Sequence, residues 1–165
     1  SNWAQAHPAQ KPAATENPGF ACRHNLQYWR NLPYLGLGAG AHGYAAGRRT
    51  ANVLSPQTYI QRLLEPADGP PPPFPLTDAS QSSVEISPEA EIGETMMMGL
   101  RLVREGVSCQ AFLRRFGKEP RACFAPQIER LTRLQLLEWA GEPPDHLRLT
   151  PRGHLLGNQV FMEFL

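Results

Sequence analysis

The 165-residue sequence has few cysteines, almost no net charge and no long hydrophobic run. Cys22, Cys109 and Cys123 are an odd number at wide spacing, which argues against a disulfide scaffold and against the closely grouped thiolates of an iron–sulfur cluster. With 16 Lys and Arg against 15 Asp and Glu, the composition shows no preference for nucleic acid or membranes. Neither a transmembrane helix nor a secretory signal is expected, so the expected location is cytoplasmic.

Chemistry-bearing residues are concentrated near the beginning of the chain. The segment Cys-Arg-His-Asn-Leu-Gln-Tyr-Trp covers residues 22–29. It offers His24 as a base or metal ligand, and the rings of Tyr28 and Trp29 as flat surfaces for a planar ligand. The alternative is that His24 and Tyr28 hold the fold together through hydrogen bonds. The thiol of Cys22 is a second candidate metal ligand of the soft type, but we expect it to have a structural role.

Residues 34–41 alternate leucine or alanine with glycine, which predicts a strand with a glycine face. Such a face indicates close approach of a ligand or of another backbone. Gly38 to Gly43 also spell a literal G-x-G-x-x-G. A dinucleotide fingerprint must open a helix in a βαβ unit, and the residues that follow have no helical repeat, so nucleotide binding of that kind is excluded.

The remainder of the sequence divides into a short helix, a spacer and a helical domain. Ser55 and Pro56 predict a helix over residues 55–65, and the prolines that follow predict an extended spacer over residues 66–83. Beyond it, capping residues and helical periodicity predict three helices, a hairpin and a closing helix, which is the order of a winged-helix-like module. The helices are expected to begin at Pro88, at Ser108, at Pro126 and at Thr150–Pro151, with the first ending near Gly106.

Three features of this helical part bear on function. The Met96–Met98 run is expected to fill the core rather than bind metal. A winged helix raises nucleic-acid binding, but residues 84–165 hold ten Lys and Arg against eleven Asp and Glu, so no nucleic-acid partner is expected. The last segment is predicted to present an apolar face to a partner surface: Leu155, Leu156, Val160, Phe161 and Phe164.

Several motifs occur together in one order: HN-x-x-YW, YLGLGAGAH, MMMGLRL, LTPRG and LLGNQVFMEFL. In these motifs and their order, the chain resembles the C-terminal part of proteins of the oxygen-independent coproporphyrinogen III oxidase-like radical-SAM family. This family includes the HemW heme chaperones. The chain lacks that family's C-x-x-x-C-x-x-C triplet. We therefore expect it to be a fragment or a natural truncation, unable to hold the family's cluster or perform its radical chemistry by itself.

The resemblance implies roles for particular residues. His24, Asn25, Tyr28 and Trp29 correspond to the segment proposed to contact heme, with His24 as the heme-iron ligand. Gly38, Gly40, Ala41 and His42 would border the S-adenosylmethionine site, with tight strand packing as the alternative. The cofactors implied are heme for this chain, and a [4Fe–4S] cluster and S-adenosylmethionine for the full-length parent.

The expected fold class is therefore α+β: the terminal piece of a radical-SAM α/β barrel over residues 1–65, a linker over 66–83 and a winged-helix-like domain over 84–165. The expected function is heme handling of the HemW chaperone type. The alternatives are anaerobic coproporphyrinogen III oxidative decarboxylation by the parent, and a winged-helix nucleic-acid-binding module. Expected partners are heme or porphyrin, the rest of the barrel and heme-recipient proteins, and exposed barrel-edge strands predict self-association.

Overall fold

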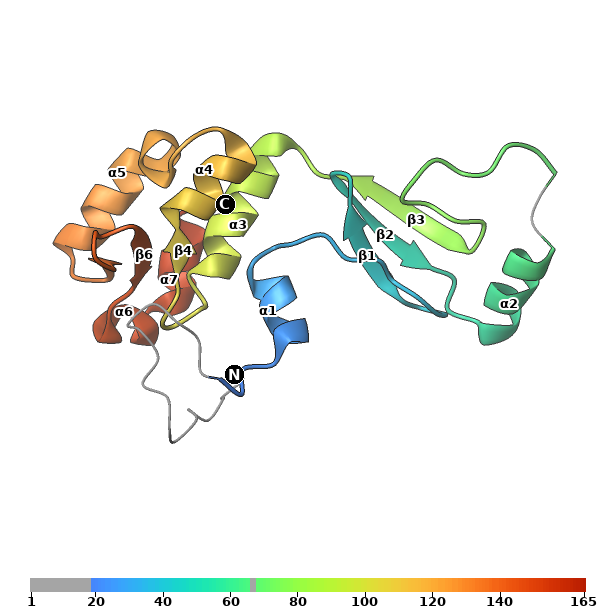
Figure 1. Ribbon diagram of the computed structural model, residues 1–165, viewed down its shortest axis with the longest axis horizontal. Helices are drawn as coiled ribbons and strands as arrows, with labels where there is room; N and C mark the ends of the chain where they lie inside the picture. The colour runs from blue at the N-terminus through green and yellow to red at the C-terminus, as the bar shows by residue number, and fades with distance from the viewer. Residues whose placement is uncertain (1–18, 66–67) are drawn as a thin grey trace. The chain divides into compact units, whose positions relative to one another are not determined.

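The computed structural model describes residues 19–65 and 68–165, and shows a mixed α/β architecture with small sheets (Figure 1). The described residues form two compact units, one of residues 32–91 and the other of residues 19–31 with 92–165. The mixed α and β composition agrees with the predicted class. The predicted domain boundaries remain a prediction, and the part of the predicted 1–65 segment before Gly19 lies outside the described residues.

The unit of residues 32–91 contains an antiparallel sheet in the order β1–β2–β3. Its strands are β1 (His42–Ala45), β2 (Arg48–Asn52) and β3 (Ser80–Glu85). The β1–β2 hairpin closes through Ala46 and Gly47, with φ of 49° and 68°, and two successive positive φ values are characteristic of the tight turns that match strand twist. Strand β3 occupies part of the expected spacer, which therefore does not extend to Ser83.

The glycine-rich segment is not the predicted strand. Only Tyr34 pairs with β1, through Tyr44, and the chain then turns at Gly38 and Gly40, whose φ values are 107° and 68°. Extended strands require negative φ, so the regular strand begins only at His42. The expected close backbone approach is confirmed at Gly36, where an added Cβ would overlap the carbonyl oxygen of His42.

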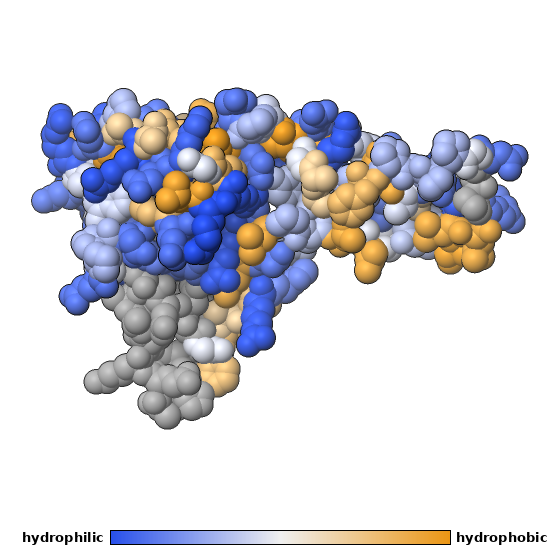
Figure 2. Space-filling view, turned by 45° about the horizontal axis from the view of Figure 1, so that its top comes forward, coloured by the Kyte–Doolittle hydropathy of each residue, from blue (hydrophilic) through white to orange (hydrophobic). Residues whose placement is uncertain are grey.

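Helix α2 (Pro56–Leu64) begins as predicted, since the Ser55 hydroxyl accepts a hydrogen bond from the Thr58 amide at 3.3 Å. It contributes no buried residue to its unit. Figure 1 shows the helix beyond the end of the sheet rather than over one of its faces. The side chains of Ile60, Leu63 and Leu64 are exposed, and hydrophobic residues gather on the surface there (Figure 2).

The second unit contains most of the helices. They are α1 (Arg23–Trp29), α3 (Pro88–Gly99, which enters this unit at Ile92), α4 (Cys109–Phe116), α5 (Pro120–Arg133), α6 (Pro151–Leu155) and α7 (Gly157–Met162). The predicted N-caps are confirmed: the hydroxyls of Ser87, Ser108 and Thr150 accept hydrogen bonds from the amides of Ala90, Ala111 and Gly153.

Three helix boundaries differ from the prediction. Helix α3 ends at Gly99 instead of near Gly106, because the amides of Arg101 and Leu102 donate to carbonyls three residues back rather than four, those of Met98 and Gly99. Helix α5 begins at Pro120, and Pro126 lies inside it behind a kink at Phe124 (φ −135°, ψ 33°). The closing helix divides into α6 and α7 at Leu156, which has non-helical dihedral angles.

The predicted hairpin is confirmed as β5 (Leu137–Ala140) and β6 (His146–Leu149), with Leu137 opposite Leu149. A third strand that the sequence analysis did not predict, β4 (Val107–Ser108), pairs with β6 and gives the sheet order β4–β6–β5. The order of elements from α3 to β6 is therefore helix, strand, two helices and a hairpin, and α6 and α7 follow.

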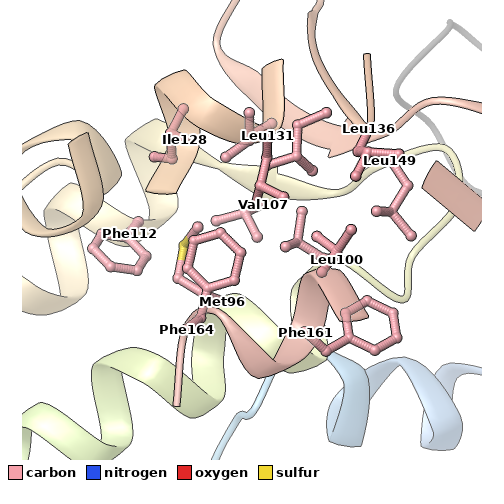
Figure 3. Close-up of a cluster of buried hydrophobic side chains, with 13 residues drawn as sticks. Met96, Leu100, Val107, Phe112, Ile128, Leu131, Leu136, Leu149, Phe161 and Phe164 are labelled. Carbon is pink, nitrogen blue, oxygen red and sulfur yellow. The ribbon is translucent and has the colours of Figure 1, made fainter. Parts of the chain in front are cut away.

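One hydrophobic core joins α3, α4, α5 and α7 with the strands of this unit (Figure 3). Met96 is fully buried in it and Met97 packs against it, which confirms the predicted core role for these two residues. The prediction that the last segment presents an apolar face to a partner surface is wrong. Val160, Phe161 and Phe164 are buried in this same core, and Leu156 packs against it. Only Leu155 of that set is exposed, so the chain provides its own partner surface.

Candidate functional site

Helix α1 carries the predicted His24, Asn25, Tyr28 and Trp29 on seven residues. At about 100° per residue, these four side chains fall within about 140° of the helix circumference. None of the residues of α1 is fully buried. An isolated helix of this length is not stable in water, so contacts to the rest of its unit must hold it.

His24 and Tyr28 form a pair across one turn of α1. The Tyr28 hydroxyl lies 3.1 Å from Nε2 of His24, and the two rings meet edge to face with centroids 4.8 Å apart. The side chain of His24 is exposed, whereas that of Tyr28 is half-buried. Within the described residues, Nδ1 of His24 makes no hydrogen bond. The pair thus orients an imidazole at the protein surface with one ring nitrogen open.

The C-terminal end of α1 is anchored by Arg30. Its Nε and Nη2 donate to the two carboxylate oxygens of Glu105, at 2.9 and 2.8 Å. These hydrogen bonds, opposed by partial burial, raise the pKa of Arg30 above its usual value. The Arg30 carbonyl accepts a long hydrogen bond from Arg115, at 3.4 Å. The next residue, Asn31, is buried and donates from its side chain to the Thr95 hydroxyl at 3.1 Å.

A second anchor lies at Trp29. The guanidinium carbon of Arg101 is 5.8 Å from the centroid of the Trp29 ring and 4.4 Å from that of Phe161. The cation therefore links α1 to α7 from its position just after α3. Arg30, Glu105 and Arg101 were not identified from the sequence, because their roles depend on contacts between residues more than seventy positions apart.

The predicted S-adenosylmethionine residues Gly38, Gly40, Ala41 and His42 lie in the other compact unit. The amide of Gly38 donates to the Tyr59 hydroxyl at 3.1 Å, and the amide of Gly40 donates to the carbonyl of Val53 at 2.8 Å. The segment enters β1 rather than a helix, so it lacks the geometry of a dinucleotide fingerprint.

Asn52 fixes this glycine turn and was not identified from the sequence. Its buried side-chain amide donates to the carbonyls of Gly36 and Gly38, both at 3.0 Å. Two of the turn's carbonyls and two of its amides are therefore hydrogen-bonded inside this unit. This network favours a structural role for the turn.

The three cysteines are free thiols: Cys22 is exposed, and Cys109 and Cys123 are half-buried. Burial, followed by the charges of Glu119 and Asp145, raises the pKa of Cys109 to about 11. That thiol is protonated at neutral pH, which disfavours it as a metal ligand or nucleophile. Across the described residues, no three His, Cys, Asp or Glu side chains converge as a metal site. None of the helices in residues 19–65 and 68–165 has the length and hydropathy needed to cross a bilayer.

Comparisons with known proteins place this geometry in context. Residues 86–156 match the family model described as the HemN C-terminal domain. Over 147 residues the chain is 37% identical to the heme chaperone HemW of Bacillus subtilis, covering 89% of this chain and 35% of the relative. It is 34% identical over 148 residues to HemW of Lactococcus lactis, covering 90% of this chain and 35% of that relative. The chain thus spans about a third of the length of these curated relatives.

Among solved structures, the chain resembles coproporphyrinogen III oxidase (HemN) from Escherichia coli, a radical SAM enzyme. The TM-score is 0.50 at 15% sequence identity, and the alignment covers 81% of this chain and 28% of the HemN chain. At this identity the likeness bears on the fold alone.

Proposed function

The chain belongs to the HemW/HemN-like family, and on that premise we propose that it acts in heme handling as the C-terminal part of a HemW-type heme chaperone. The observation that supports heme contact by this chain is the His24–Tyr28 pair on α1, in which the side chain of His24 is exposed. The identity to curated heme chaperones over about nine-tenths of the chain favours this function over the alternative of oxidative decarboxylation.

In this proposal, His24 provides the axial ligand to the iron of the heme cargo. Neutral imidazole ligates a metal through the nitrogen without a proton, and the other ring nitrogen commonly donates to a neighbouring oxygen. If Nε2 of His24 donates to the Tyr28 hydroxyl, the open Nδ1 carries the lone pair. Tyr28 then fixes the tautomer and the ring orientation, while Trp29 and Asn25 border the porphyrin.

The cofactors of the full-length parent belong to this proposal as well. The three cysteines of this chain do not converge, so they do not fit a [4Fe–4S] cluster, and we assign that group to the parent. We place Gly38, Gly40, Ala41 and His42 at the border of the S-adenosylmethionine site. Because the Gly38 and Gly40 amides are already hydrogen-bonded, this segment would contribute the open space beside Gly38 and the side chain of His42.

The finer architecture is proposed on similar grounds. We propose that residues 84–165 form a winged-helix-like module, because the order α3, β4, α4, α5, β5, β6 has a hairpin that follows three helices. Residues 1–65 would form the C-terminal end of the radical-SAM barrel region of a longer protein, and residues 66–83 would be the linker that follows it. The cellular location of the protein would be the cytoplasm, where free thiols such as the three in this chain are usual. Heme-recipient proteins would be its partners.

A hemin titration followed by absorbance in the Soret region tests the heme assignment. We expect saturable binding by the wild-type chain and a loss of at least tenfold in affinity, with a changed Soret maximum, in His24→Ala, since a metal ligand is removed. His154→Ala is the matched control, because His154 is also exposed on a short helix of the same unit. Unchanged spectra in His24→Ala would contradict the assignment.

Full-length protein distinguishes the chaperone from the oxidase. Anaerobic assays with a reconstituted cluster and S-adenosylmethionine should yield no decarboxylated coproporphyrinogen if the parent is a chaperone. Formation of that product would instead favour the enzymatic alternative.

A further inference from the structure

Arg101 occupies an unusual position beside the proposed heme surface. Its guanidinium carbon stands over the rings of Phe161 and Trp29, at 4.4 and 5.8 Å from their centroids. Phe161 is buried in the core, whereas Trp29 is half-buried on α1. Two aromatic neighbours thus hold the cation at the edge of the α1 surface.

Within the part of the chain that the structure describes, the guanidinium of Arg101 has no carboxylate partner. Four other arginines are ion-paired: Arg30 with Glu105, Arg48 with Glu85, Arg130 with Glu163 and Arg148 with Glu138. The Glu105 carboxylate, only four residues from Arg101, uses both oxygens on Arg30. It therefore does not compete for Arg101.

A guanidinium carries five N–H donors in a rigid planar fork, and a contact with aromatic rings leaves donors available to a ligand. These donors match the two oxygens of a carboxylate. Arg101 is exposed, so a ligand can reach them. Helix α1 contains Arg23 and no acidic residue, and Arg104 follows Arg101 in the same loop, where the charge of Glu105 is balanced by Arg30.

We infer that Arg101 is a carboxylate-binding residue for a planar ligand seated on α1, and that the carboxylate is a propionate side chain of the porphyrin. This inference rests on the proposed heme binding at α1. Heme carries two propionates along one edge of its ring and iron at its centre. The α1 surface offers an aromatic ring and a cation side by side, at Trp29 and Arg101, together with the exposed imidazole of His24.

The test compares hemin with its dimethyl ester, in which both propionates are neutral. The two compounds are titrated under identical detergent conditions into the wild-type chain and into Arg101→Gln. The wild type should bind hemin roughly tenfold or more tightly than the ester, as expected for a hydrogen-bonded charge pair. Arg101→Gln should remove that difference by weakening hemin binding alone. Arg104→Gln, which removes an exposed arginine of the same loop, should retain the wild-type preference.

Equal binding of hemin and its ester by the wild type would overturn the role of Arg101 and leave heme binding at α1 intact. An unchanged preference in Arg101→Gln would also overturn it. If neither compound binds the wild type, the proposed heme function of this chain fails together with the inference. Because the first comparison uses only the wild type, it holds even if Arg101→Gln fails to fold, which circular dichroism would report.

Discussion

At the scale of single residues, the account depends most on how Tyr28 orients His24. The 3.1 Å contact joins the Tyr28 hydroxyl to a nitrogen of an otherwise exposed imidazole. We expect Tyr28→Phe to keep the edge-to-face ring contact but to weaken hemin binding about three- to tenfold, the worth of one hydrogen bond. Absorbance titration measures this, with Tyr59→Phe in the other unit as the control. Wild-type affinity in Tyr28→Phe would show that Tyr28 does not position the ligand.

Cys109 allows a second prediction at this scale, which concerns pH. Its thiol has a pKa raised to about 11 by burial and by the neighbouring acids Glu119 and Asp145. The thiolate is the reactive form, and only about one thiol in a thousand is ionised at pH 8, so the alkylation rate should rise about tenfold per pH unit up to pH 10. Mass spectrometry after timed iodoacetamide treatment measures the rate at this residue. A rate that levels off below pH 9 would contradict the raised pKa.

At the scale of elements, α1 is kept in place by contacts at its C-terminal end. Glu105→Gln removes the charge partner of Arg30 while it preserves the shape of the side chain. Since Arg30 is partly exposed, the pair is worth only about 1 kcal/mol, and the amides of α1 should exchange hydrogen about two- to fivefold faster. Glu85→Gln breaks a similar pair in the other unit and should leave α1 unaffected. Equal exchange in α1 for wild type and Glu105→Gln would disprove the anchor.

The glycine turn depends in the same way on Asn52. Asn52→Ala leaves the carbonyls of Gly36 and Gly38 without their side-chain donor. The free energy of local opening should fall by about 1–3 kcal/mol, because both groups of a part-buried network lose their partner. Hydrogen exchange at the amides of β1 and β2 measures it, and Asn158→Ala, an exposed residue of α7, is the control. Unchanged protection would mean that the backbone hydrogen bonds suffice.

Elements with strong local determinants were predictable from the sequence. Ser55, Ser87, Ser108 and Thr150 each begin a helix as N-caps, because their hydroxyls need only an amide two or three residues away. The hairpin of β5 and β6 also follows from local patterning.

Elements that depend on distant partners were not predictable. Strand β3 has a polar sequence with mostly exposed side chains, and its pairing with β2 determines it. Helix α1 has no buried residue, so its sequence has no apolar stripe from which a helix could be predicted. The alternation of residues 34–41 was misleading because Leu35 and Leu37 are exposed rather than packed on a core. The identities of His24 and Tyr28 were apparent from the motif, whereas Arg101 and Asn52 required the folded structure.

At the scale of the whole molecule, the chain spans about a third of its heme-chaperone relatives and forms two compact units. The helical unit carries α1 and its anchors, and the other unit carries the glycine turn. The central claim is that heme contacts this chain at α1 in the helical unit.

Hydrogen exchange with and without one equivalent of hemin tests that claim most directly. The account predicts slower exchange for residues 23–31 and for the loop around Arg101, and no change for residues 34–45. Protection confined to residues 34–45, or no protection anywhere under conditions where hemin binds, would contradict it.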